Sequence, residues 1–164
     1  MNQPPTDWVW VKPQHLSLFK VRDSEARVGV YGPCNKSKLK RMTHESMMMF
    51  AETWIAAWNR RDIDAVLVHF AEEAQFVSPV ALNFVGRPVL RNKKELEDYW
   101  RRALDRISVL EFKLDHATWD ERRRELNVVY EANVNGERKR ACETMQFDTS
   151  GRQIKGEAFY GAAI

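Results

Sequence analysis

One carboxyl group stands in the middle of an apolar pattern. Residues 140–148 read RACETMQFD, and every second residue gives the set Ala141, Glu143, Met145 and Phe147. Because a β-strand directs alternate side chains to opposite faces, these four share one face. A carboxyl group that loses water is driven towards its neutral form, which can hold a proton or donate a hydrogen bond. Glu143 is therefore the leading candidate for acid–base chemistry or for binding a polar group inside the fold.

A hairpin signal predicts the same face for Glu143. Asn135-Gly136 is the strongest short signal for a two-residue turn, and closing that turn pairs Val128 with Glu143. The apolar faces of both strands then lie on one side of the sheet. Tyr130 is diagonal to Glu143, so its hydroxyl is a candidate donor in the same place.

The strand that follows carries small residues on its inward face. Gly156 and Ala158 alternate with polar residues, and their size predicts room for a ligand above the carboxyl of Glu143. The alternative is a structural carboxyl, paired inside with Tyr130, with Trp54 or with a base from the N-terminal segment, because a buried Glu requires a partner or a raised pKa.

His116 is the second candidate titratable group. It ends an alternation that begins at Leu110, which predicts an inward-facing histidine, either catalytic or held in the core by a backbone group. The four histidines lie on separate elements without a neighbouring acid cluster, and Cys34 and Cys142 match no metal spacing. The sequence predicts no metal and no cofactor.

Composition indicates one folded domain with an unusual N-terminal segment. The chain has 164 residues, of which 44% are hydrophobic and 11% aromatic. Residues 1–44 hold eight Lys or Arg against three acids, a net charge of +5, whereas the remainder holds 18 against 20, a net charge of −2. Because the remainder offers no matching basic face, we interpret the segment as a solvated tether rather than a nucleic-acid-binding arm.

The location predicted from the same data is the cytoplasm. No stretch approaches the ~20 apolar residues of a membrane span, no secretory signal is visible, and two cysteines are too few for a disulfide framework. We expect no membrane partner.

Hydrophobic spacing predicts helices first and strands afterwards. A helix from Glu45 has Phe50, Trp54 and Trp58 on one face, and a second one, capped by Asp62, has a stripe that ends at Phe70. A strand, QFVSPV, ends at Pro79, and a third helix covers residues 92–107. Four strands in an antiparallel meander complete an α+β domain.

The domain is predicted to span residues 45–164, with residues 1–44 as a loosely structured extension. Short strands are expected around residues 8–11 and 26–31, and Met42 offers a plausible start for the compact domain.

Two stretches carry a resemblance to a known family. The run FAETWIAAWNRRDIDAVLVHFAEEAQFVSP, the later FDTSGRQIKGEAFYG and the order of the elements resemble the nuclear transport factor 2-like superfamily, which includes ketosteroid isomerases and SnoaL-like polyketide cyclases. The resemblance extends from about Phe50 to Gly161. It implies a cone-shaped, curved, mainly antiparallel sheet wrapped around three N-terminal helices, with an apolar pocket and commonly a dimer.

The resemblance also assigns positions. Where ketosteroid isomerases have a catalytic carboxylate before a proline, this sequence has Ser78; where they have a donor tyrosine, it has Trp54; and where they have a protonated acid on a late strand, it has Glu143. A serine cannot take a proton without an activating partner, so steroid isomerisation by that mechanism is not expected.

The resulting expectation is a small-molecule-binding domain whose apolar pocket takes a hydrophobic molecule with a carbonyl or hydroxyl group. The predicted lining is Trp54, Phe76, Ser78, Tyr130, Glu143 and Met145, although the aromatic members serve equally well as core. The alternatives are an isomerase, cyclase or hydratase that uses Glu143, with His116 as a second group, and a non-catalytic dimerisation scaffold. A homodimer through the sheet is expected because Val129 and Phe159 are apolar on an otherwise polar outer face.

Overall fold

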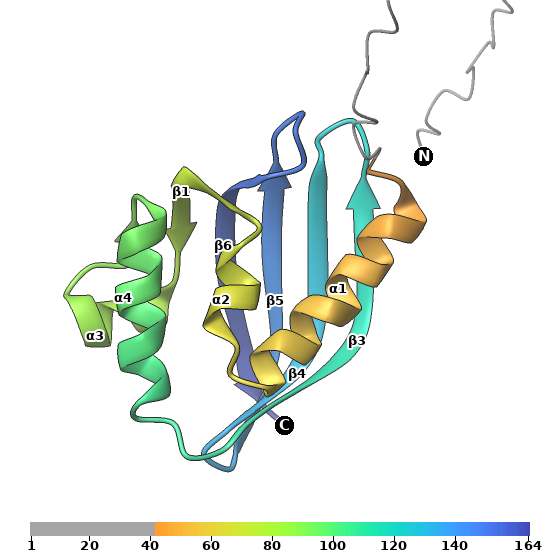
Figure 1. Cartoon of the computed structure of the whole chain (residues 1–164). Helices are drawn as coiled ribbons and strands as arrows, with labels where there is room; N and C mark the ends of the chain where they lie inside the picture. The colour runs from red at the N-terminus through yellow and green to blue at the C-terminus, as the bar shows by residue number, and fades with distance from the viewer. Residues whose placement is uncertain (1–41) are drawn as a thin grey trace, which may run out of the picture. The chain divides into compact units, whose positions relative to one another are not determined.

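The computed structural model describes residues 42–164, which begin with helices and end with strands (Figure 1). The helices are α1 (His44–Asn59), α2 (Ile63–Leu67), α3 (Leu82–Val85) and α4 (Lys93–Leu104), and a 3₁₀ turn, η1 (Pro79–Ala81), precedes α3. The strands expected around residues 8–11 and 26–31 lie outside the described residues. The boundary at residue 44 stays a prediction.

Six strands form one sheet, in the order β2-β1-β6-β5-β4-β3. They are β1 (Phe70–Val77), β2 (Val89–Leu90), β3 (Leu110–Asp120), β4 (Glu125–Val134), β5 (Glu137–Phe147) and β6 (Gln153–Ala163). Only the β1–β6 pair is parallel. The sheet is curved and unclosed, with α1 lying across β3 and β4, and α4 beside β1 (Figure 1). The predicted α+β fold and the antiparallel meander are confirmed.

Side-chain caps explain where the three longer helical segments begin. Thr43 and Ser46 form a reciprocal capping box before α1. The carboxylate of Asp62 accepts a bond from Ala65 N at 3.0 Å, as the sequence predicts, and Asn92 caps α4. These bonds satisfy backbone N–H groups that have no partner within their own helix.

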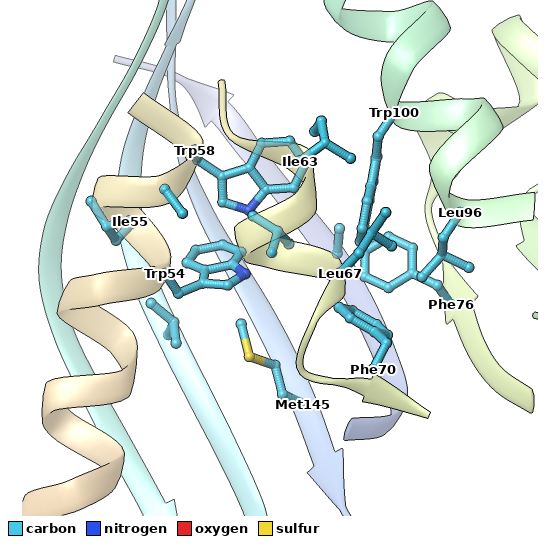
Figure 2. Close-up of a cluster of buried hydrophobic side chains, with 14 of the residues drawn as sticks. Trp54, Ile55, Trp58, Ile63, Leu67, Phe70, Phe76, Leu96, Trp100 and Met145 are labelled. Carbon is cyan, nitrogen blue, oxygen red and sulfur yellow. The ribbon is translucent and has the colours of Figure 1, made fainter. Parts of the chain in front are cut away.

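The core lies between the helices and the inner face of the sheet. Figure 2 shows Trp54 and Trp58 extending from α1 and Trp100 from α4 into one cluster. The ring of Trp100 contacts those of Trp58, Phe70 and Phe76 at centroid distances of 5.2, 5.5 and 5.5 Å, all edge to face. Trp100 therefore links both long helices to β1.

Three local expectations are corrected. The second helix ends at Leu67 rather than Phe70, because Phe70 starts β1 and pairs with Gln153 of β6. The last predicted helix ends at Leu104 instead of residue 107. In the loop that follows, the carbonyls of Ile107 and Ser108 accept hydrogen bonds from the guanidinium of Arg61. The strand QFVSPV, predicted to end at Pro79, ends at Val77 as part of β1, and η1, α3 and β2 follow it.

None of the helices within residues 42–164 is both long enough and apolar enough to cross a membrane.

Candidate functional site

A cavity of about 400 Å³ lies between α4, the η1–α3 segment and the inner face of the sheet. Its size falls within the range of small-molecule sites in proteins. Most of its wall is aromatic or aliphatic, with rings from Trp58, Phe76, Phe84, Trp100, Phe112 and Tyr130. Polar atoms on the wall are few, so each one restricts what can bind.

Glu143 is buried on this wall. It lies on β5 between Val128 of β4 and Ala158 of β6, which is the register predicted from the Asn135-Gly136 turn. Only 4% of its surface is exposed, and its Oε1 atom has no hydrogen-bond partner among the described residues. Burial raises the pKa of this carboxyl from 4.5 to about 8. Glu143 is therefore mostly neutral at pH 7.

Four hydroxyl groups, three of them phenols, accompany the carboxyl. Ser78, fully buried between β1 and η1, has its Oγ 3.2 Å from the hydroxyl of Tyr99 on α4. Tyr130 and Tyr160 reach the same cavity from β4 and β6. Burial raises the pKa of all three phenols, and a charge on Glu143 would raise them further. The phenols thus stay protonated and act as hydrogen-bonding groups, not as bases.

An indole donor is also without a partner. Trp58 lines the cavity, and its Nε1 atom is buried with no acceptor among the described residues. A buried polar atom left unpaired costs about 1–3 kcal/mol. A polar ligand group that forms a hydrogen bond with Glu143 Oε1 or with Trp58 Nε1 removes this cost for the atom that it contacts.

The site can therefore bind a polar group in an apolar enclosure and can hold or release one proton near neutral pH. Glu143 is the group that titrates in that range, because the surrounding phenols do not. No cluster of three or more His, Cys, Asp or Glu side chains suited to a metal ion occurs in residues 42–164.

The predicted lining residues divide into two groups. Phe76, Ser78, Tyr130 and Glu143 line the cavity, but Trp54 and Met145 do not, and their expected place there is corrected. Both are buried in the core. Trp54 is covered by Trp58, Phe112 and Tyr130, with ring centroids 5.6–6.4 Å away. Met145 lies two residues further along β5, opposite Gly156.

His116 does not belong to the site, and its predicted inward orientation is wrong. The register of β3 shifts between Leu114 and His116, so one extra residue turns the histidine to the outer face. Its side chain is 52% exposed and lies 3.6 Å from Asp115. The sequence does carry a signal of this bulge, because the apolar residues change from even positions up to Leu114 to odd positions at Ala117 and Trp119.

Tyr99, like Trp58, Arg106 and Tyr160, is a site residue that the sequence analysis missed. It is buried on α4 at the spacing Leu96, Tyr99, Trp100, Ala103, which is one helical face at i, i+3, i+4 and i+7. That spacing was available in the sequence. The Ser78 contact was not, because it joins segments 21 residues apart.

The open end of the cavity is formed by the loop after α4 and by the β4–β5 hairpin. Oδ1 of Asn135 accepts bonds from Ser108 N, Ser108 Oγ and Val109 N at 2.8, 2.9 and 3.1 Å. Nδ2 of Asn135 donates to the carbonyl of Arg106 at 3.3 Å. From the other side Arg61 donates to the carbonyls of Ile107 and Ser108. The rim is thus held by side chains from two directions.

Comparison with known proteins identifies a family that matches this chain. The model of the SnoaL-like domain matches residues 51–155. A SnoaL-like protein of unknown function from Burkholderia thailandensis has 29% identity and a TM-score of 0.66, with 75% of this chain and 100% of that one covered. A comparison with curated proteins finds no match.

Two further solved structures share the fold at lower identity. An NTF2-like protein of unknown function from Burkholderia pseudomallei has 18% identity and a TM-score of 0.59, covering 70% of this chain and 91% of its own. The epoxide hydrolase/cyclase-like enzyme SalBIII, involved in pyran ring formation in salinomycin, has 17% identity and a TM-score of 0.56, covering 71% and 92%.

Proposed function

The chain belongs to the SnoaL-like domain family of the nuclear transport factor 2-like superfamily, and from that premise we propose that it binds a hydrophobic small molecule bearing a carbonyl or hydroxyl group. The observation that carries the proposal is the neutral, unpartnered carboxyl of Glu143 on the wall of an apolar cavity.

The chemistry of the wall selects the polar group of the ligand. A neutral carboxyl can donate one hydrogen bond and accept another, and the indole N–H of Trp58 can only donate. A carbonyl oxygen can accept a hydrogen bond from either donor, and a hydroxyl satisfies Glu143 in either direction. An anion placed beside Glu143 would oppose ionisation of the carboxyl and find no cation there, so the inner end of the ligand is uncharged.

The proposal is tested with two ligands of nearly the same shape, 2-acetylnaphthalene and 2-isopropenylnaphthalene, in which a CH2 group replaces the carbonyl oxygen. Binding is followed by quenching of tryptophan fluorescence, since Trp58 and Trp100 line the cavity. One hydrogen bond to a buried carboxyl predicts about tenfold tighter binding of the ketone. Glu143→Gln retains a donor and keeps the preference, whereas Glu143→Leu abolishes it.

Thr144→Val, one residue further along β5 and on the outer face, is the matched control and leaves both affinities unchanged. Equal affinity for the two ligands in the wild-type protein, or no binding of either, contradicts the proposal.

An enzyme of the isomerase, cyclase or hydratase type is the second candidate function. It is favoured by the pKa of Glu143, about 8, which suits a group that donates and recovers a proton near neutral pH. Because the carboxyl is mostly neutral at pH 7, its first step would be proton donation to the ligand. Activity would then fall as the pH rises through 8.

A homodimer forms through the outer face of the sheet in this proposal. Val129, Cys142 and Phe159 are cross-strand neighbours on β4, β5 and β6, and they make one continuous apolar row. Phe159 is 46% exposed. The row also supports a dimerisation scaffold as an alternative role, which differs from the binding proposal in needing no ligand.

A further inference from the structure

A cation stands at the open end of the cavity with no carboxylate partner in the part of the chain that the structure describes. Arg106, in the loop after α4, lines the cavity, and its guanidinium lies over the ring of Phe84 at 5.2 Å from the centroid. Within residues 42–164 it forms no ion pair with an acidic side chain. Its backbone is fixed by Asn135, so the side chain projects from a rigid rim.

The other charges at the rim cancel. Lys139 and Glu137, which also line the cavity, form an ion pair of 2.8 Å. The remaining acidic residue on the wall is Glu143, and burial keeps its carboxyl neutral. The open end therefore has a net positive charge, supplied by Arg106, while the inner end has none.

The separation of the two ends follows from the strand that joins them. Lys139 and Glu143 both point to the inner face of β5, four residues apart, which corresponds to about 13 Å along a strand. An apolar body spanning that distance has one end at the neutral carboxyl and the other end near Lys139, at the end of the cavity that Arg106 also lines.

We propose that the ligand is an amphipathic organic anion, with its carboxylate or other acidic group bound at Arg106 and its neutral polar group beside Glu143. This inference rests on the proposed function, since it specifies the outer end of the same ligand. The cation at Arg106 is presented by the stacked Phe84 ring, which leaves the edge of the guanidinium available for two parallel hydrogen bonds to an acid.

Two fluorescent probes with the same aromatic body test the inference. 1-Anilinonaphthalene-8-sulfonate carries one negative charge, and N-phenyl-1-naphthylamine carries none. In the wild-type protein we expect the anionic probe to bind at least as tightly as the neutral one. Arg106→Gln lowers the affinity for the anionic probe about fivefold, because one partly exposed charge contact is lost, and changes the affinity for the neutral probe less than twofold.

Arg102→Gln is the matched control. It removes the same charge from the exposed face of α4, away from the cavity lining, and leaves both probes unchanged. High salt reduces the difference between wild type and Arg106→Gln.

Each other outcome is decisive. Equal losses in Arg102→Gln and Arg106→Gln indicate a response to net charge alone and overturn the inference, as does an unchanged anionic affinity in Arg106→Gln. Failure of both probes to bind the wild-type protein contradicts the proposed function as well, whereas binding of the neutral probe alone overturns only the inference.

Discussion

Glu143 couples the ionisation of one side chain to the stability of the whole domain. Its pKa is about 8 in the folded protein against 4.5 in the unfolded chain, so between these values the folded state holds the proton more tightly. The contribution of Glu143 to the free energy of unfolding therefore falls as the pH rises from 4.5 through 8, and is level outside this interval. The total change is on the order of 5 kcal/mol.

Glu143→Gln removes this dependence while keeping the size and a hydrogen-bond donor. We expect its free energy of unfolding, measured by urea denaturation from pH 5 to 8.5, to decline much less than that of the wild type. At pH 7 the variant is as stable as the wild type or more stable. Burial of His69 lowers its pKa and removes stability as the pH falls below 6.5, but this effect is common to both proteins and cancels in the comparison.

Glu157→Gln provides the control, because Glu157 is exposed on the neighbouring strand. It keeps the wild-type slope. Strong destabilisation of Glu143→Gln at pH 7 would instead mean that the native carboxylate is ionised and paired.

At the scale of single residues, the sequence predicts which face of a strand a side chain occupies, because that depends on periodicity. It does not predict which side chain fills the space beside a residue, because that depends on packing. Alternation and turn type suffice to bury Glu143 opposite Val128. The room expected above Gly156 is filled: a Cβ atom at that position would lie 2.6 Å from Cδ2 of Phe76. A glycine in a strand can admit a ligand or a neighbouring ring, and the sequence does not distinguish the two.

The β4–β5 hairpin shows the same division at the level of elements. Asn135 and Gly136 adopt positive φ values of 54° and 89°, as the predicted two-residue turn requires. What the sequence does not reveal is that the Asn135 side chain also binds the loop after α4, 26–29 residues away. Likewise, α3 has four residues, too few to produce a helical period.

Asn135→Gly separates these two roles of the side chain. Glycine accepts the positive φ, so the turn persists, but the bonds to Ser108, Val109 and Arg106 are lost. These bonds are exposed, so water can replace them in part. We therefore expect the free energy of unfolding to fall by only about 1–3 kcal/mol. Amide hydrogen exchange at Ser108 and Val109 should accelerate.

Asn133→Ala removes a single bond, from Gly136 N to Asn133 Oδ1, and is the matched control. Its effect stays within the hairpin. Equal acceleration of exchange in the loop by both variants would show that Asn135 does not hold the rim.

At the scale of the whole molecule, the two faces of the sheet differ in what covers them. Helices cover the inner face of the described domain, as Figure 1 shows, while the outer face is crossed by the row Val129, Cys142 and Phe159. Ion pairs such as Arg140–Asp115 and Arg138–Glu131 flank this row. An apolar centre with a charged surround is the composition of a protein interface.

We propose a dimer from that composition, because a row in the middle of a sheet can pair with the same row of a second copy about a two-fold axis. We expect the wild-type protein to be a dimer at about 10 µM by light scattering, a concentration that corresponds to roughly 7 kcal/mol of association free energy. Phe159→Lys would place a charge opposite its own copy or beside apolar neighbours, and should give a monomer with an unchanged melting temperature at low protein concentration. Thr118→Lys adds the same charge to exposed β3 and should leave the dimer intact. A monomeric wild-type protein would rule out this interface. A dimer that survives Phe159→Lys would place the interface on another face of the protein.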